Sequence, residues 1–236
     1  YAGALAISTP NLLKLRQLQE MLLDSHLEPS AVEWVNKQLG TRIFGRAVEH
    51  PFLLVSFEDV ERSVQYQLTW LQDACDSLGV QVQERRTGHT ETEAMLSVMR
   101  EHLPNSKDIA DDELVVSVKL LSMLADVPAV YENAQHAAEE KGLKLDFHGG
   151  LYTGISRATV RADWGQQQDV MEWLRAVESS IQRLNGRSVI EAAPRKIKTM
   201  LNVWGAAAED WHLMKDIKHK IDPMRILNPG RFIGGI

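Results

Sequence analysis

Two parts of this chain follow the same order of elements: a strand, an amphipathic helix and a further strand. In the first part, the apolar run 52–58 predicts a strand, and apolar residues at steps of three and four predict a helix over 64–78. Residues 80–84 alternate between apolar and polar side chains, as a half-buried strand does. Because each such helix has one apolar stripe to bury, this order requires a sheet with helices packed on it.

The second part repeats the order with more elements. Strands are expected at 113–121, 143–148, 152–162 and 188–191, and helices at 128–141 and 170–184. Successive β-α-β units of this kind form a largely antiparallel sheet with helices on one face. The sequence therefore predicts an α+β fold of duplicated ferredoxin-like units, followed by a C-terminal helical tail.

We expect one domain over the whole chain, in four parts: N-terminal helices at 1–50, a first ferredoxin-like half at 51–90, a second half at 113–191, and C-terminal helices with a tail at 192–236. Thr9 and Pro10 are typical of a helix start. Apolar residues from Val32 to Leu39 predict a second short helix, which ends at Gly40. The segment at Tyr1 resembles an internal strand, so we expect that the chain belongs to a longer protein.

Composition excludes several classes of protein. The 236 residues, 44% hydrophobic and 25% charged, are typical of a globular domain, and no apolar run reaches the roughly 18 residues of a membrane-spanning helix. The net charge of -6 argues against nucleic acid as the main partner. Cys75 is the single cysteine, which excludes a disulfide framework and a multi-cysteine metal site. We expect a cytoplasmic protein without direct membrane insertion.

Charge is distributed unevenly along the chain. Residues 91–113 carry seven acids and two bases, whereas residues 195–231 carry eight bases and four acids. The basic end is explained either by an anion that it faces or by ordinary solvated lysines on helix exteriors. None of the eight histidines has a second histidine four residues away, so we expect no metal site.

The stretch 146–162 is the most unusual in the chain, because three glycines indicate that its backbone approaches something closely. His148, Tyr152, Arg157 and Arg161 lie in or beside it. One interpretation is a hairpin with both arginines in solvent. The other is a pocket wall in which a planar guanidinium binds a carboxylate. Spacing alone does not separate the two.

The C-terminal stretch has a more specific pattern. Leu213, Met214, Ile217 and Ile221 are expected to face inward from a helix, and Ile226, Leu227 and Phe232 to bury the tail on the core. The sequence from Lys218 to Phe232 reads Lys-x-x-x-Asp-Pro-x-x-Ile-Leu-Asn-Pro-Gly-Arg-Phe, and a Trp-Gly pair lies upstream at 204–205. This pattern resembles the C-terminal signature of FAD-linked oxidases, the family of D-lactate dehydrogenases and glycolate oxidases. It is most similar to the E subunits of bacterial glycolate oxidases.

The resemblance is specific over residues 185–236 and architectural over the first 180. It implies the C-terminal cap or substrate domain of an FAD-dependent 2-hydroxy-acid oxidoreductase, one wall of the flavin and substrate site. FAD would be held mainly by an N-terminal domain that is not in this chain, so the isolated chain is expected to be inactive. The implied partners are that FAD-binding domain, other glycolate oxidase-type subunits and a small 2-hydroxy acid, with membrane association only through partner subunits.

The resemblance also suggests roles for individual residues. Arg157 could bind the carboxylate of the substrate, and Tyr152 or His148 could contact its hydroxyl group. The residues expected to lie against the flavin or its binding domain are Asn228, Arg231 and Trp204.

The chain departs from the family at its metal motif. The metal-dependent dehydrogenases carry G-H-x-G-D-G-N-x-H and a later E-H-G, whereas this chain has only Phe147-His148-Gly149-Gly150 and no E-H-G. The metal-assisted mechanism is therefore not carried over. Two alternatives remain open: a non-catalytic flavoprotein subunit of an oxidase complex, and a free-standing ferredoxin-like ligand-binding module. Flavin bands in the visible spectrum of the full-length protein would separate the second from the oxidase interpretations.

Overall fold

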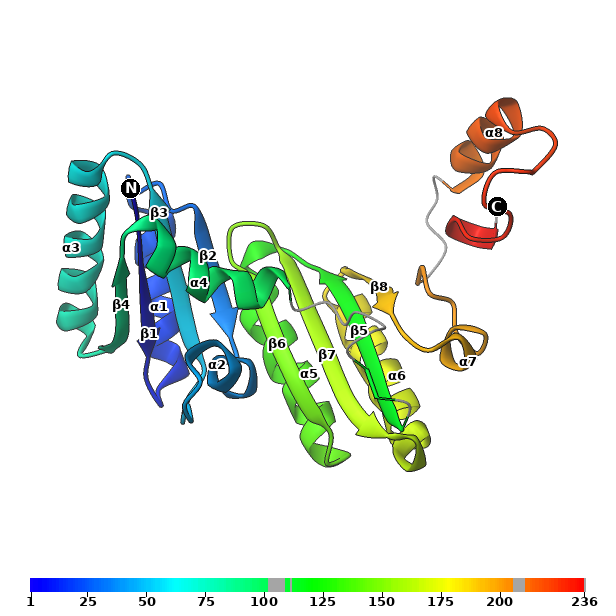
Figure 1. Cartoon of the computed structure of the whole chain (residues 1–236), viewed down its shortest axis with the longest axis horizontal. Helices are drawn as coiled ribbons and strands as arrows, with labels where there is room; N and C mark the ends of the chain where they lie inside the picture. Colours follow the sequence, from blue (N-terminus) through cyan, green and yellow to red (C-terminus); the bar gives the residue numbers. More distant parts are fainter. Residues whose placement is uncertain (102–108, 111, 206–210, 236) are drawn as a thin grey trace.

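A computed structural model describes residues 1–101, 109–110, 112–205 and 211–235. Its eight strands form one sheet in the order β4-β1-β3-β2-β6-β7-β5-β8, and every neighbouring pair is antiparallel (Figure 1). The strands are β1 Ala2–Ser8, β2 Ala31–Val35, β3 Phe52–Glu58, β4 Gln81–Thr87, β5 Glu113–Leu121, β6 Lys144–Gly150, β7 Ile155–Asp163 and β8 Arg187–Ala192.

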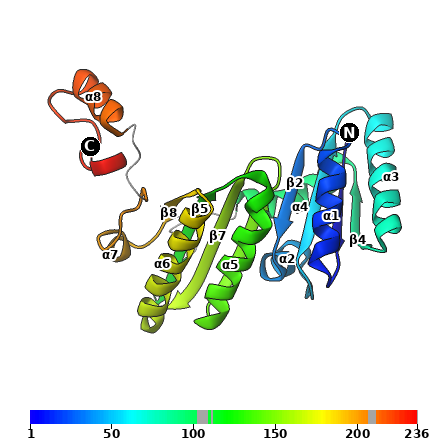
Figure 2. The ribbon, with the colours of Figure 1, turned by 180° about the vertical axis from the view of Figure 1, so that it is seen from behind.

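The helices are α1 Leu12–Leu23, α2 Lys37–Phe44, α3 Glu61–Leu78, α4 His89–Arg100, α5 Val127–Glu140, α6 Gln167–Arg183, α7 Arg195–Lys198 and α8 Trp211–Ile221, with short 3-10 turns at Leu124–Asp126, Trp164–Gln166 and Ile233–Gly235. Helices α1, α3, α5 and α6 cover one face of the sheet (Figure 2). Helices α2 and α4 pack on the opposite face over the first four strands.

The sheet consists of two ferredoxin-like units. The first unit has the element order β1-α1-β2-β3-α3-β4, and its strands lie in the sheet as β4-β1-β3-β2. The second unit has the matching element order β5-α5-β6-β7-α6-β8, and its strands lie in the equivalent arrangement β8-β5-β7-β6. The corresponding strands β2 and β6 pair with each other and join the units into one sheet. This confirms the predicted α+β fold of duplicated units.

The first unit is longer than predicted. It extends over Ala2–Thr87 rather than 51–90, because residues 31–35 form strand β2 and not a helix. Their apolar spacing also fits a helix, but Trp34 is buried among the helices on one face while Val35 is buried on the other, as strand alternation requires.

Two helix boundaries also differ from the prediction. Asn11, rather than Thr9, caps α1, since its side chain accepts a hydrogen bond from the Leu13 amide at 3.1 Å. Gly40 lies inside α2 instead of ending it. Glycine is needed at this position because a Cβ there would come within 2.5 Å of the Phe52 ring. The helix ends at Gly45, whose φ of 63° is the left-handed conformation that glycine adopts readily.

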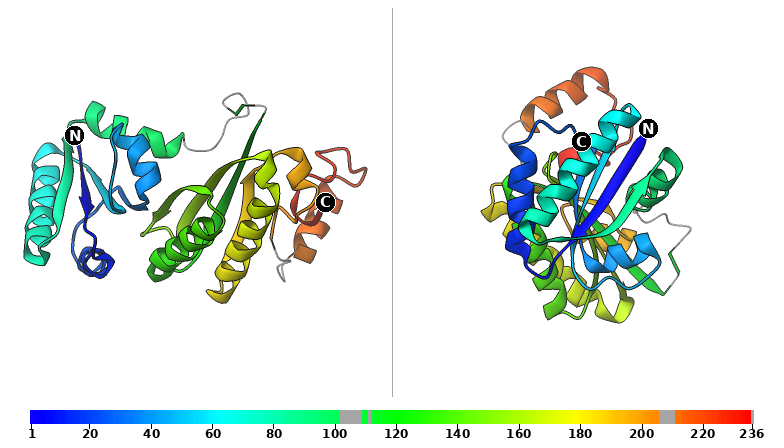
Figure 3. Two further views of the ribbon diagram at one scale, coloured as in Figure 1. Left: turned by 90° about the horizontal axis from the view of Figure 1, so that it is seen from below. Right: turned by 90° about the vertical axis from the view of Figure 1, so that its left-hand side faces the viewer.

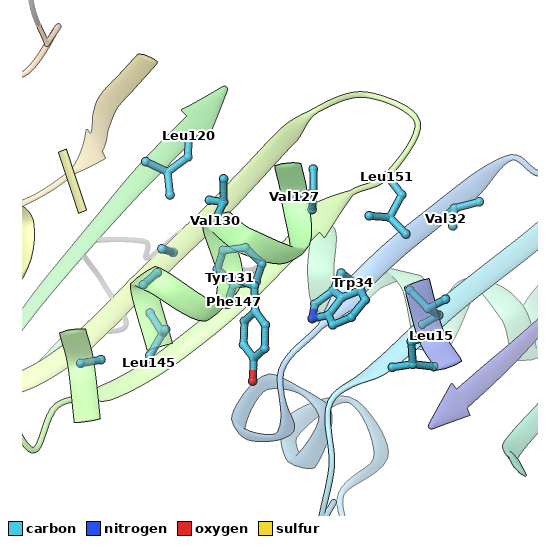
Figure 4. Close-up of a cluster of buried hydrophobic side chains, with 14 of the residues drawn as sticks. Leu15, Val32, Trp34, Leu120, Val127, Val130, Tyr131, Leu145, Phe147 and Leu151 are labelled. Atoms are coloured by element: carbon cyan, nitrogen blue, oxygen red, sulfur yellow. The ribbon is translucent and has the colours of Figure 1, made fainter. Parts of the chain in front are cut away.

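The seam between the units is short and buried. Strands β2 and β6 share three residue pairs, from Glu33 opposite Gly150 to Val35 opposite His148. Next to them, Trp34, Tyr131 and Phe147 form an aromatic cluster with ring centroids 6.0 and 5.3 Å apart (Figure 4). Each ring comes from a different element, so the cluster ties β2, α5 and β6 together.

Asn36 closes the seam where β2 ends. Its Oδ1 accepts hydrogen bonds from the amides of Leu39 at 3.0 Å and Phe147 at 3.1 Å, and its Nδ2 donates to the carbonyl of Leu145 at 2.7 Å. One buried side chain therefore caps α2 and extends the pairing of β2 with β6.

The C-terminal segment does not pack as predicted. Helix α8 lies beyond the β8 edge of the sheet (Figure 3). Leu213, Ile217 and Ile221 are exposed and Met214 is half-buried, so the helix does not turn these side chains into the core. Side chains of the tail at Ile226, Leu227 and Phe232 are exposed too, which removes the expected burial.

Replacing the seam asparagine should destabilise the whole sheet. Asn36→Ala leaves buried backbone groups of both units without partners, so the free energy of unfolding should fall by about 2–4 kcal/mol in a urea titration. Asn11→Ala is the matched control, because it removes an exposed helix cap that is worth about 1 kcal/mol. Equal losses in the two variants would show that Asn36 acts only as the cap of α2.

Candidate functional site

Among the described residues, the second unit has no helix of its own on one face of its sheet, and only α2 of the first unit packs there, against β6. Along β7, Ala158 and Val160 are buried toward α5 and α6, so the alternating residues Arg157, Thr159 and Arg161 point to the other side. We call this side the open face.

Five charged or titratable residues cross the open face side by side. The strand register places His148 opposite Arg157 and Arg157 opposite Lys119. Glu33 on β2 contacts His148, and Glu191 on β8 contacts Arg157. We call this set the charged row.

The two carboxylates of the charged row hold His148 and Arg157 in place. Glu33 Oε2 lies 3.0 Å from His148 Nδ1, and this histidine is almost fully buried. Glu191 binds Arg157 through two contacts, 2.9 Å from Oε2 to Nε and 3.4 Å from Oε1 to Nη2. A fork of this kind fixes the plane of the guanidinium group.

A β-bulge aims Glu191 at the arginine. Ser117 pairs with Ala192 while Val118 pairs with Ile190, so Glu191 is the extra residue on β8. Such an insertion redirects a side chain that regular alternation would place elsewhere.

A second polar layer lies next to the charged row. Asp146 is buried against Arg42 of α2, and Arg161 reaches Glu113 at 3.1 Å. Burial raises the pKa of Asp146 above its usual value, although the nearby Arg42 and Arg161 act in the opposite direction. Arg161 is therefore paired on the open face and is not a solvated side chain.

Tyr152 is separated from His148 and Arg157. Its hydroxyl donates to the carbonyl of Leu22 at 3.1 Å, and its ring packs on the core beneath the helices. Of the three residues predicted for one substrate site, the structure brings His148 and Arg157 together and places Tyr152 on the opposite side of the sheet.

The glycines of the stretch 146–162 pack closely against other residues of the same chain. A Cβ on Gly149 would come within 2.5 Å of the Ser156 hydroxyl and 2.7 Å of Val127. Gly154 has a φ of 67° in the turn between β6 and β7, and its carbonyl accepts from the Ser122 amide at 2.9 Å. Internal packing thus accounts for glycine at these positions.

A groove of about 1000 Å³ continues from the charged row toward the C-terminal segment. We call it the terminal groove. Lys119 and Glu191 belong to both features, and the other charged lining residues are Arg195, Lys198 and Arg231. The aromatic residues of its wall are Trp204, Trp211 and Phe232. With four cations and one carboxylate among the described lining residues, the groove suits an anion with an aromatic or apolar part.

Two of the three residues predicted to contact a flavin line this groove. Trp204 and Arg231 do so, and the Trp204 ring meets Phe232 edge-on with centroids 5.8 Å apart. Asn228 is not among the lining residues. Its φ of 45° and the hydrogen bond from the Arg231 amide to its carbonyl at 3.2 Å show that it forms a turn.

The Trp-Gly pair is explained by its contact with β8. The Ile190 amide donates to the Val203 carbonyl at 2.8 Å, so the segment before Gly205 runs along the edge of β8. Gly205 has a φ of 75°, and a Cβ there would lie 2.6 Å from the Ser188 carbonyl oxygen. This close approach brings Trp204 to the groove wall.

Asp222 organises the turn that ends α8. Its carboxylate accepts hydrogen bonds from Lys218 Nζ at 2.7 Å and from the amides of Ile226 and Leu227 at 2.9 and 3.0 Å. The Lys218 contact, above all, lowers the pKa of Asp222 to about 2. Much of the Lys-x-x-x-Asp-Pro-x-x-Ile-Leu pattern is thus a self-contained turn.

Sequence analysis did not select Lys119, Arg195 and Lys198. Lys119 is the one basic residue in the apolar strand 113–121, and this feature could have indicated a functional role. Arg195 and Lys198 lay within the basic end of the chain, where only the fold could show which bases share a groove.

Two kinds of feature are absent from residues 1–101, 109–110, 112–205 and 211–235. No group of three or more His, Cys, Asp or Glu residues there is arranged to hold a metal ion. No helix in this part of the chain has the length and apolarity needed to cross a membrane.

Solved structures show what the chain is similar to. 4-Ethylphenol oxidase from Gulosibacter chungangensis, as its isoeugenol complex, matches with a TM-score of 0.63 and 15% identity over 98% of this chain and 53% of its own. For p-cresol methylhydroxylase with substrate bound the TM-score is 0.60, with 9% identity over 98% and 52%. For alkyldihydroxyacetonephosphate synthase it is 0.59, with 13% identity over 97% and 44%. The chain shares their fold.

No protein-family model matches the chain, and no curated protein matches it in sequence. The chain spans about half the length of the solved proteins that it matches.

The Asp222 turn should respond to acid in a defined range. Because the folded pKa is lowered from 3.8 to about 2, ionised Asp222 stabilises the turn above pH 4, and this contribution is lost as the pH falls through 2. Carboxyl-carbon NMR should show Asp222 still ionised at pH 3. Lys218→Gln should raise the midpoint toward 3.8, and an unchanged midpoint would mean that Lys218 does not hold the carboxylate.

Proposed function

We propose that this chain forms one wall of the flavin and substrate site of an FAD-dependent oxidoreductase that acts on a small 2-hydroxy acid. The observation that carries the proposal is the continuity of the charged row with the basic, aromatic terminal groove. The C-terminal pattern supports the same class, because its Trp-Gly and Asn-Pro-Gly-Arg-Phe segments supply Trp204, Arg231 and Phe232 to the groove.

The residues of the groove fit part of a flavin nucleotide. Arg195, Lys198 and Arg231 offer cations for phosphate oxygens, and Trp204 and Phe232 offer apolar surface for a ring. The sequence has no glycine-rich loop that cradles phosphates, so we assign most of the FAD contacts to a separate N-terminal domain. When bound, FAD would supply the acceptor for the hydride of the α-carbon.

The charged row could bind and orient the acid. Lys119 has no ion pair among the described residues, and it lies beside Arg157, so the two cations together could hold the substrate carboxylate. Glu33 lies 3.0 Å from His148 Nδ1 and fixes the imidazole beside Arg157, where the ring could contact the substrate hydroxyl.

A second function is favoured by a specific observation. Arg157 already uses Nε and Nη2 on Glu191, and the metal motif of the metal-dependent dehydrogenases is absent from the sequence. Both features suit a flavoprotein subunit that supports an oxidase complex without oxidising the acid itself. The exposed apolar tail argues against the free-standing module, since such a surface marks a contact with another body.

The tail could be that contact. Ile217, Ile221, Met224 and Ile226 are exposed on α8 and the turn after it. We infer that they pack on the FAD-binding domain of the longer protein, which is consistent with matches that are about twice the length of this chain.

The function is tested in the full reading frame that encodes this chain. The purified protein should show flavin absorption bands and oxidise a 2-hydroxy acid such as glycolate or D-lactate. Lys119→Gln and Arg157→Lys should each lower kcat/KM by about ten- to a hundredfold, mainly through KM, because a charge-assisted contact to the carboxylate is lost. Arg161→Lys is the matched control, since Arg161 is held by Glu113 outside the charged row.

The outcomes distinguish the proposals. A protein without flavin bands would overturn both flavoprotein functions. A flavin-containing protein that is inert toward hydroxy acids by itself, in a complex whose oxidation of them is unchanged by Lys119→Gln and Arg157→Lys, would support the non-catalytic subunit. Loss of kcat/KM in Arg161→Lys equal to that in Arg157→Lys would show a general effect of charge on the open face.

The tail contact predicts opposite behaviour in two forms of the protein. Ile217→Glu together with Ile226→Glu should leave the melting temperature of the 236-residue chain unchanged, because both side chains are exposed. The same pair should lower the melting temperature of the full-length protein by several degrees, because it would bury two charges against the second domain. Unchanged melting in both forms would exclude the contact.

A further inference from the structure

A second hollow lies in the first unit, far along the sheet from the terminal groove. It has a volume of about 720 Å³, within the range of sites for small organic ligands. Its wall combines the end of β1, the start of α1 and β4, and the segment between α2 and β3. We call it the first-unit cavity. None of the roles discussed above involves it.

The two units place their hollows at corresponding positions. In the first unit Ala6 pairs with Glu84 and Ile7 with Val82, so Gln83 is the extra residue of a β-bulge, as Glu191 is in the second unit. Both bulged residues line their hollows. By the same register, Ser8 in β1 corresponds to Lys119 in β5.

Ser8 gives the first indication of a ligand. Only 7% of it is exposed, and it is one of the polar residues that line the cavity. A hydroxyl at the wall of the cavity can donate to or accept from a polar ligand atom that reaches it.

The charges around the cavity indicate the sign of the ligand. Lys14, Arg46 and His50 line it together with one carboxylate, Glu49. Lys14 Nζ makes only a 3.5 Å contact with the Gly79 carbonyl and is therefore available. Arg46 is positioned by Glu84 at 3.1 Å and by the Phe44 ring 5.5 Å from its guanidinium carbon.

Three apolar side chains also line the cavity. Phe44, Val48 and Phe52 line it, and Phe52 is fully buried. The side-chain amide of Gln83 donates to Gln81 Oε1 at 3.4 Å, and both residues line the cavity. An occupant would therefore need an apolar body and one anionic group.

We propose that the first-unit cavity binds a small organic anion, a ring or branched apolar group that carries one phosphate or carboxylate. Its anionic group meets Lys14, Arg46 and the Ser8 hydroxyl, and its apolar part lies on Phe44 and Phe52. The inference does not depend on the proposed oxidoreductase function.

The purified 236-residue chain is titrated with phenyl phosphate, benzoate and, as a neutral control, benzyl alcohol, and followed by amide NMR and calorimetry. At least one anion should shift the amides of Ser8, Gly79 and Gln81 saturably and leave Gly205 at the terminal groove unshifted. Benzyl alcohol should bind at least tenfold more weakly. The anion that binds more tightly identifies phosphate or carboxylate as the preferred group.

Variants localise the contacts. Lys14→Gln and Arg46→Gln should each weaken binding about tenfold, and Glu84 keeps Arg86 as a partner at 2.9 Å when Arg46 is replaced. Ser8→Ala should weaken binding about three- to tenfold without lowering the stability of the free chain. Ser117→Ala is the matched control: its hydroxyl accepts from Thr159 at 2.9 Å, so stability should fall while binding is unchanged.

Three results would overturn the proposal. The first is the absence of saturable shifts with either anion. A second is a set of shifts centred on Gly205 instead of Ser8. The third is Ser8→Ala binding as tightly as the unmodified chain.

Discussion

Everything on the open face depends on three residue pairs between β2 and β6. This pairing turns two four-stranded sheets into one, and it is completed by a single side chain, Asn36, that bonds two backbone groups across the seam and one in its own unit. The Glu33–His148 contact crosses the same seam. If the pairing slipped by one residue, every side chain of β6 would exchange faces and the charged row would be lost.

The two faces of the sheet differ in polarity at the seam. On the helix side, Trp34, Tyr131 and Phe147 continue the core of one unit into the next. On the other side, α2 and α4 seal the first unit, and the described residues offer no comparable helix for the second. Charged side chains on this face need ion pairs or contact with another protein surface. The Arg157–Glu191 and Arg161–Glu113 contacts are such ion pairs.

Sequence patterns predicted the elements whose periodicity has one solution. The strand expected at 113–121 and the helix at 128–141 appear as β5 and α5 within a residue. Residues 31–35 could not be assigned from their pattern, because the spacing of Val32 and Val35 fits a helix as well as a strand. Pairing with the neighbouring strands β3 and β6 makes this segment a strand. The amphipathic tail raised a different problem: the pattern shows that a stripe needs a partner and does not say where the partner is. Likewise His148 and Arg157 were selected from one hairpin, whereas Lys119 joins them through pairing with a strand more than thirty residues away.

The antiparallel contact between equivalent strands has a consequence for symmetry. Two identical subunits that joined edge to edge through their second strands would be related by a two-fold axis and would present two identical faces. Here a continuous chain carries both copies, so each can acquire its own substitutions. One copy has two helices of its own over this face of its sheet and a serine beside its bulge, whereas the other has, among the described residues, no helix of its own there and a lysine at the matching place. Fusion thus allows a single binding surface where a homodimer would be obliged to build two.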